Sequence, residues 1–194
     1  CLYDSSAVFL FWGYQFMSSG VATTLHFMYP VLTTLIMMIF FHEKKSLWRM
    51  AAIALAVAGV FFLSNGDGTG SVTWSGIFIV LLSALGYALY LVTVSQLKNL
   101  EMKGLKMTFY VFLFGGILLF IGTEASGIGL QAIPDRTTLG NLVMLALVPT
   151  VISNLALVRA IKNIGSTLTS VLGAMEPVTA VCVGIAIFGE PFTR

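Results

Sequence analysis

Long apolar runs separated by short polar connections make up nearly the whole chain. A helix that crosses a membrane needs roughly 17 to 25 residues that are mostly apolar. The pattern predicts seven such helices, of which the first and fifth are short: about 3–18, 21–41, 48–64, 74–96, 107–122, 139–158 and 166–188. The connections between them are brief and rich in turn residues. We therefore predict an all-α membrane protein, a multi-pass helical bundle.

Composition supports this fold class and narrows the kind of function. Hydrophobic residues make up 58% of the chain and charged residues 9%, against roughly 25% charged in an ordinary soluble domain. Lysine and arginine are spread through short connections, so we expect no nucleic-acid partner. His26 and His42 have no partners at metal-ligand spacing, and the glycines at 66–70 lack the Lys-Ser/Thr pair of a phosphate-binding loop. We expect neither a metal nor a cofactor.

Two of the apolar stretches share one pattern and indicate an internal duplication. Proline is followed thirteen residues later by glutamate in both, as Pro30 with Glu43 and Pro177 with Glu190. The same offset of 147 residues superimposes Ser19 on Ser166. Thirteen helical residues rise roughly 20 Å, so each glutamate lies near a membrane surface if its proline lies at mid-depth.

The basic residues predict the orientation of the helices. Those on one side are Lys44, Lys45, Arg49, Lys98, Lys103, Lys106, Arg159 and Lys162, and those on the other are Arg136 and Arg194. The positive-inside rule places the first group in the cytoplasm, so the two copies of the repeat run in opposite directions. Inverted repeats are typical of secondary transporters. Residues 1–64 then supply three helices of a first unit and residues 74–194 four helices of a second. If each unit has five, further helices are expected beyond both ends.

The repeated segments carry a resemblance to a known family. They read GVATTLHFMYPVLTTLIMMIFFHEKKSLWRMAAIALAVAGVFFLSNG and IGSTLTSVLGAMEPVTAVCVGIAIFGEPFT, with a small or Thr-rich opening, a mid-helix proline and a terminal glutamate. This pattern resembles the EamA-type transporters of the drug/metabolite transporter superfamily. The resemblance implies an inner-membrane protein of two inverted five-helix repeats that moves small metabolites across the bilayer. It selects neither the substrate nor the oligomeric state.

Glu176 is the main candidate for a functional group. An ionisable side chain at mid-membrane depth marks a transport pathway, a proton relay or a buried partner. A carboxylate in an apolar environment can exchange a proton near neutral pH, because its charged form is poorly solvated there. Pro177 removes a backbone hydrogen bond and is expected to kink the helix, as is Pro30 in the other copy. The alternative is a neutral glutamate that only bonds a neighbouring helix.

Other polar and aromatic groups at membrane depth are candidates for the lining of a cavity. Tyr29 occupies the place of Glu176 in the first repeat, and His26 lies on roughly the same helix face. Tyr87 and Tyr90 recur at helical spacing, and their ring faces suit cations or other rings. Asn154 follows Pro149, which is expected to break its helix. Each of these residues has a structural alternative, as a packed ring or an interhelical hydrogen bond.

We therefore expect a secondary transporter of small metabolites such as amino acids or drugs, working by alternating access, with proton coupling as one hypothesis. A membrane channel, a facilitator or a structural subunit without ion coupling is the alternative. An enzyme is not expected, because we place Asp4 toward the cytoplasmic side and Asp67 in an outer turn, which leaves Glu176 without a second acid at membrane depth. The expected partners are a small-molecule substrate and the lipid bilayer.

Overall fold

The computed structural model describes residues 2–17, 19–43, 51, 73–97, 104–125, 127, 133–173, 175, 176, 179 and 186. All regular secondary structure in these ranges is helical. Within the described residues, four helices are long and apolar enough to cross a membrane: Val21–Phe40, Trp74–Gln96, Gly104–Ala125 and Arg136–Ile164. The chain is an all-α membrane protein, as the apolar pattern predicts.

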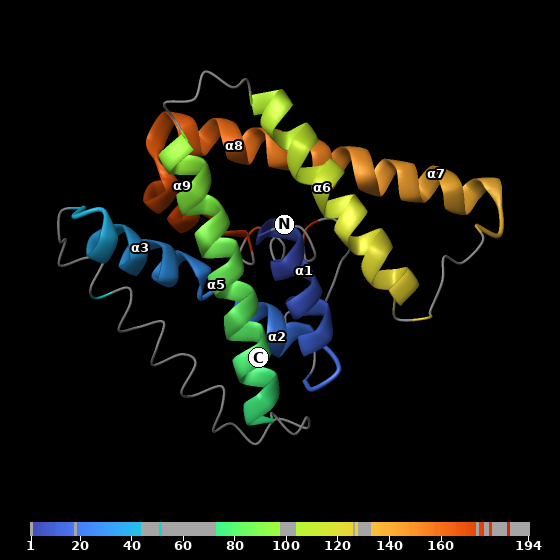
Figure 1. Cartoon of the computed structure of the whole chain (residues 1–194), viewed down its shortest axis with the longest axis horizontal. Coiled ribbons are helices and arrows are strands. Elements are labelled where there is room, and N and C mark those ends of the chain that lie inside the picture. Colours follow the sequence, from blue (N-terminus) through green and yellow to red (C-terminus); the bar gives the residue numbers. More distant parts are fainter. Residues whose placement is uncertain are drawn as a thin grey trace.

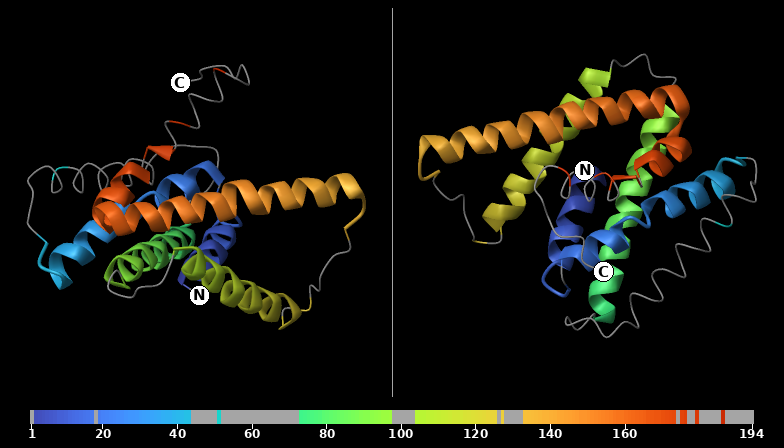
Figure 2. Two further views of the ribbon diagram at one scale, coloured as in Figure 1. Left: turned by 90° about the horizontal axis from the view of Figure 1, so that it is seen from above. Right: turned by 180° about the vertical axis from the view of Figure 1, so that it is seen from behind.

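The helices are labelled in Figure 1. In chain order they are α1 (Leu2–Gly13), α2 (Ser19–His26), α3 (Tyr29–Phe40), α5 (Trp74–Gln96), α6 (Gly104–Ala125), α7 (Arg136–Leu145), the π-helical segment η2 (Ala146–Ile152), α8 (Ser153–Ile164) and α9 (Ser166–Gly173). Figures 1 and 2 show α7, η2 and α8 as one long rod that crosses the molecule.

Helix α5 organises the packing of the other helices. It lies side by side with α1 and also contacts α2, α3, α8 and α9 (Figure 2). Ser6 of α1 and Ser83 of α5 join the two helices by exchanging hydrogen bonds: each hydroxyl donates to the carbonyl of the other residue, at 2.8 Å and 2.6 Å. Both residues are at most 2% exposed, so these polar groups are satisfied inside the bundle.

The structure confirms some predicted helix boundaries and corrects others. Helix α5 begins and ends where the prediction places it, while the fifth and sixth predicted helices are longer than predicted. The first predicted helix stops at Gly13 and is followed by a turn, and the second is interrupted between His26 and Tyr29. A continuous apolar run shows where a chain is buried in lipid but not whether its backbone is continuous. The third predicted helix lies outside the described residues except for residue 51, as does most of the seventh beyond Gly173.

The expected break at Pro149 is wrong. The helix continues from Arg136 to Ile164, and Pro149 lies inside the π-helical segment η2. Proline has no backbone N–H and its ring crowds the preceding turn, so a wider turn accommodates it without ending the helix. The Thr150 hydroxyl donates to the carbonyl of Leu145, five residues earlier, at 3.1 Å.

The two predicted repeats share a backbone feature. Helices α2 and α9 have eight residues each and cover equivalent positions of the two repeats. A turn follows each helix at equivalent methionines: the Met28 amide donates to the Leu25 carbonyl at 3.0 Å, and the Met175 amide to the Leu172 carbonyl at 3.1 Å. In both predicted repeats, the turn therefore lies directly before the residue in question, which is Tyr29 in the first and Glu176 in the second.

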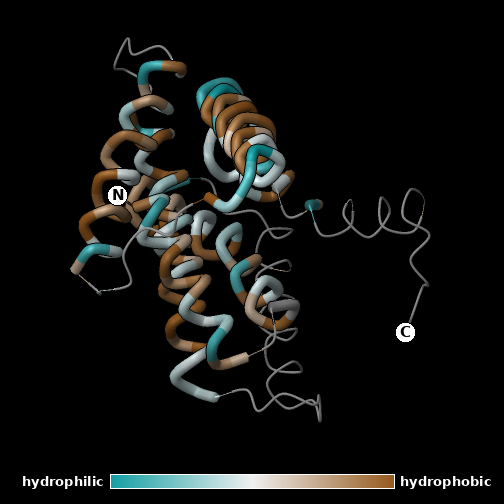
Figure 3. Tube along the Cα trace, turned by 90° about the vertical axis from the view of Figure 1, so that its right-hand side faces the viewer, coloured by the Kyte–Doolittle hydropathy of each residue, from teal (hydrophilic) through white to brown (hydrophobic). Residues whose placement is uncertain are grey.

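Large apolar side chains are exposed along α6 and along the rod formed by α7, η2 and α8. Figure 3 shows the long hydrophobic stretches of the helices along the Cα trace. Phe109 is 60% exposed, Met144 is 63% exposed and Leu145 is 61% exposed. So much exposed apolar surface would be unfavourable in water and is expected where lipid tails are the solvent.

Candidate functional site

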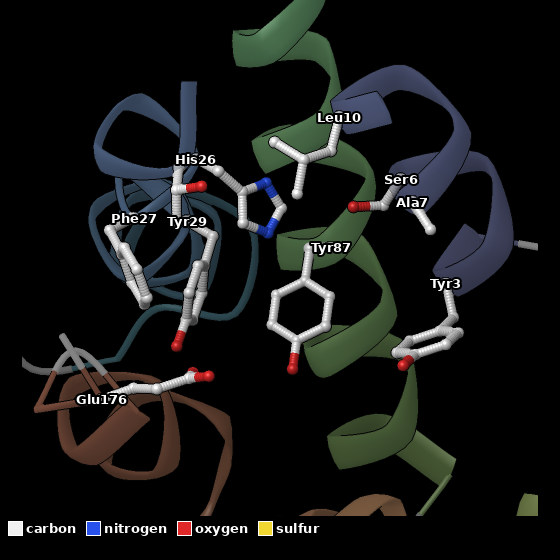
Figure 4. Close-up of a pocket in the computed structure, with 10 residues that line it drawn as sticks. Tyr3, Ser6, Ala7, Leu10, His26, Phe27, Tyr29, Tyr87 and Glu176 are labelled. Atoms are coloured by element: carbon white, nitrogen blue, oxygen red, sulfur yellow. The ribbon is translucent and has the colours of Figure 1, made fainter. Parts of the chain in front are cut away.

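A cavity of about 260 Å³ lies where the two halves of the chain meet (Figure 4). Helices α1 and α2, together with Tyr29 at the start of α3, contribute most of its lining. Tyr87 of α5 and Glu176 complete it from the second half of the sequence. The cavity therefore contains residues from both predicted repeat units.

Glu176 lies at one end of this cavity. It directly follows the turn at Met175, and its side chain is exposed. Figure 4 shows its carboxylate on the side toward which the hydroxyl ends of Tyr29 and Tyr87 point. The helix interruption thus presents an acid to the cavity.

Aromatic rings form a continuous series along the cavity. The rings of Tyr29 and Tyr87 meet edge to face, with centroids 4.7 Å apart at 82°. Tyr3 continues the series at 6.2 Å from Tyr87 and 5.4 Å from Tyr90. Tyr3 also lines the cavity, although it is not among the predicted site residues.

The hydrogen bonds of His26 fix the tautomer of its neutral ring. Ser83 Oγ lies 3.0 Å from His26 Nδ1 and gives its only proton to the Ser6 carbonyl. Nδ1 must therefore be the donor to Ser83, because a hydroxyl has one proton and two lone pairs. The other ring nitrogen, Nε2, is then a hydrogen-bond acceptor on a residue that lines the cavity.

Two predicted site residues lie behind the cavity rather than in its lining. Tyr90 is 4% exposed, and its hydroxyl donates to Asn154 Oδ1 at 3.3 Å. The Thr108 hydroxyl donates to the same oxygen at 3.3 Å, so Asn154 links α5, α6 and α8. Asn154 Nδ2 is buried without a hydrogen-bond partner among the described residues. This geometry is that of an interhelical hydrogen bond.

Asp4 corrects one expectation from the sequence. We placed it toward the cytoplasmic side, yet it is 5% exposed and its carboxylate packs against Gly115, near the middle of α6. A Cβ atom at Gly115 would overlap the Asp4 carboxylate. Asp4 is thus a second acid inside the bundle. The sequence signal that could have identified it is a lone acid in the first turn of an otherwise uncharged helix.

The backbone near Pro30 positions Tyr29. Pro30 lies in the first turn of α3, after the interruption, where its missing N–H costs no hydrogen bond. The hydroxyls of Thr33 and Thr34 donate to the carbonyls of Tyr29 and Pro30, both at 2.8 Å. These bonds hold the first turn of α3 and with it the Tyr29 ring. Pro177, the equivalent proline, lies outside the described residues.

A second contact between the two halves lies at the other end of α3. The Thr167 hydroxyl of α9 donates to Glu43 Oε2 at 2.7 Å. Thr167 is 3% exposed, and α3 and α9 pack together.

In the part of the chain that the structure describes, no group of three or more His, Cys, Asp or Glu side chains could hold a metal ion.

Known proteins resemble the chain along most of its length. The EamA-like transporter family matches residues 5–65 and 74–194. The uncharacterized inner membrane transporter YedA of Escherichia coli K12 is 25% identical over 181 residues, which are 93% of this chain and 58% of YedA. The uncharacterized transporter YdfC of Bacillus subtilis strain 168 is 26% identical over 185 residues, 92% of this chain and 58% of YdfC. The chain spans 58% of the length of these curated relatives, and it belongs to the EamA-like transporter family.

Proposed function

We propose that the chain forms part of a secondary transporter that carries small metabolites across the cytoplasmic membrane by alternating access. The observation that carries this proposal is the cavity, which contains residues from both repeats and has Glu176 at one end. Secondary transporters bind their substrates near mid-membrane at the interface between repeats, where interrupted helices present polar groups. A helix interruption and residues from both predicted repeat units are found around Tyr29 and Glu176, which supports the proposal.

The side chains take distinct roles in this proposal. Glu176 binds the substrate or a coupled proton, and His26, Tyr29 and Tyr87 contact the substrate. Tyr90 and Asn154 hold the helices behind the cavity through their hydrogen bond. Pro30 and Pro177 maintain the interruptions that place Tyr29 and Glu176.

The orientation of the protein is part of the same proposal. The loops that carry Lys44, Lys98 and Arg159 face the cytoplasm by the positive-inside rule. A single cysteine at Ser46 should react with an impermeant reagent only from the cytoplasm, and one at Ser71 only from outside. Labelling on the opposite sides would reverse the topology.

The transport proposal is tested with the full-length protein in lipid vesicles that contain a pH-sensitive dye. Amino acids, nucleosides and organic cations are added in turn to the parent and to Glu176→Gln. A compound that drives saturable proton movement in the parent and not in the variant supports a proton-coupled carrier. Equal proton movement in both proteins would make Glu176 structural. Flux that does not saturate would indicate a channel instead.

A further inference from the structure

We infer that the cavity at Glu176 selects a positively charged organic ligand, namely a small amine or quaternary ammonium compound. The inference rests on the proposed function where transport is concerned, because it names the substrate class of that same site. Binding can be measured without transport, so the inference about the ligand and the proposed transport function can be contradicted independently.

The charge of the lining supports a cationic ligand. Of the ten residues that line the cavity in the described part of the chain, Glu176 is the only acid and none is lysine or arginine. The Glu176 side chain is exposed, so its carboxylate is accessible to a ligand in the cavity. The described lining supplies no charged partner, so a positive charge on the ligand completes the site.

The aromatic rings favour the same class of ligand. Tyr3, Tyr29 and Tyr87 all line the cavity and lie in contact as a series. The faces of such rings carry partial negative charge and attract ammonium groups within about 6 Å of the ring centre. An ammonium group beside Glu176 would lie near the hydroxyl ends of Tyr29 and Tyr87, and the rings would surround the part of the ligand further into the cavity (Figure 4).

The same groups disfavour anions and zwitterions. An anionic ligand would lie beside the Glu176 carboxylate and would find no lysine or arginine in the described lining. The accepting nitrogen of His26 cannot donate a hydrogen bond to a ligand carboxylate. A free amino acid would satisfy Glu176 with its amino group but would leave its own carboxylate without a charged partner.

The size of the cavity limits the ligand further. Sites for drug-sized molecules have volumes of roughly 300 to 1,000 Å³. The cavity here has about 260 Å³, which suits a ligand with one ring or a short aliphatic body.

The test compares four compounds that share a benzene ring and differ in charge. They are phenethylamine, 2-phenylethanol, 3-phenylpropionate and phenylalanine, and binding to the purified full-length protein is measured by equilibrium dialysis. We expect phenethylamine to bind most tightly and 3-phenylpropionate most weakly. Glu176→Gln should weaken phenethylamine binding by roughly tenfold or more and leave 2-phenylethanol unchanged, because only the cation loses a charged partner.

Matched variants separate charge at the cavity from charge elsewhere. Glu124→Gln removes an exposed acid at the end of α6, outside the cavity lining, and should leave binding unchanged. Tyr87→Phe keeps the ring face and should retain most of the affinity for phenethylamine. Tyr87→Leu removes the ring and should weaken that affinity by roughly threefold to tenfold.

The outcomes are distinguishable. Tighter binding of phenylalanine or 3-phenylpropionate than of phenethylamine would overturn the inference, as would cation binding that survives Glu176→Gln. Absence of cation binding in the parent would also overturn it. Cation-selective binding with no saturable uptake into vesicles would support the inference and contradict the proposed transport function.

Discussion

Tyr29 and Glu176 stand 147 residues apart at equivalent positions of the two predicted repeats, and both line the same cavity. Each follows a turn at an equivalent methionine and precedes a proline. The duplication thus places two related positions at one site, one with a phenol and the other with a carboxylate. Because of this asymmetry, Glu176 is the one acid in the described lining of the cavity, while both backbones have a turn at the same place.

The Tyr29 hydroxyl also occupies the space beside Gly173, the last residue of α9. A Cβ atom at Gly173 would overlap this hydroxyl. We expect Gly173→Ala to lower the free energy of unfolding by about 1 to 3 kcal/mol, the usual cost of overpacking, in thermal unfolding of the purified protein. Tyr29→Phe removes the oxygen and should restore stability in the double variant. A double variant no more stable than Gly173→Ala would show that another contact causes the loss.

Gly115 and Gly116 provide a matched pair on α6. A Cβ atom at Gly115 would overlap the Asp4 carboxylate, whereas nothing lies within 4 Å of one at Gly116. We expect Gly115→Ala to destabilise the protein by about 1 to 3 kcal/mol. Gly116→Ala should be neutral or slightly stabilising, because alanine favours a helix more than glycine does. Similar unfolding temperatures for the two variants would contradict the placement of Asp4 against α6.

The hydrogen bond from Thr167 to Glu43 joins the ends of α3 and α9, on the side that the topology assigns to the cytoplasm. We expect Thr167→Val to favour opening of this side by about 1.5 kcal/mol, or roughly tenfold, the low end for a bond to a charged group. A cysteine at Ala7, which lines the cavity, should then react faster with a reagent added from the cytoplasm. Thr167→Ser keeps the hydroxyl and should react like the parent. Equal rates in the Val and Ser variants would exclude a gating role for this bond.

Asp135 caps α7 just outside the membrane-spanning segment. Its carboxylate accepts a hydrogen bond from the Thr138 amide at 2.8 Å, and bonding to Thr138 lowers the pKa of Asp135 from its usual 3.8. The cap therefore stabilises α7 at pH values above 3.8, the usual pKa of the carboxyl group. This stabilisation is lost as the pH falls through the lower pKa of Asp135 in the folded state. We expect the Thr138 amide to lose hydrogen-exchange protection at such low pH. Asp135→Asn keeps a capping oxygen and should remove this pH dependence. Protection that still changes with pH in Asp135→Asn would assign the effect to another group.

Much of the fold could be predicted because lipid imposes a strong constraint on sequence. A helix in the bilayer must be apolar over its whole length, so runs such as 74–96 identify it directly. The repeated proline and glutamate also predicted the duplication, since both pairs superimpose at the same offset of 147 residues. The family followed from the same residues, and the match over residues 5–65 and 74–194 confirms it.

Helix continuity could not be predicted in the same way. Both the turn at Met28 and Pro149 lie within long apolar stretches of the sequence, yet the turn interrupts its helix and Pro149 does not. Whether the helix continues depends on the neighbouring groups that satisfy the backbone where its regular hydrogen bonds are lost. Near Pro149 a π-helical segment accommodates the ring within one long helix.

The sequence by itself determined the membrane class, the duplication and the choice of Glu176 as a candidate site, because each depends on residue type and spacing along one chain. Only the tertiary structure decided which polar groups share a cavity. It brought Tyr3 beside Tyr87, placed Tyr90 and Asn154 behind the cavity, and buried Asp4 against Gly115. In helices that are apolar on every face, periodicity does not show which side faces a neighbour. That choice is made by packing between helices distant in sequence, here by α5 against the helices around it.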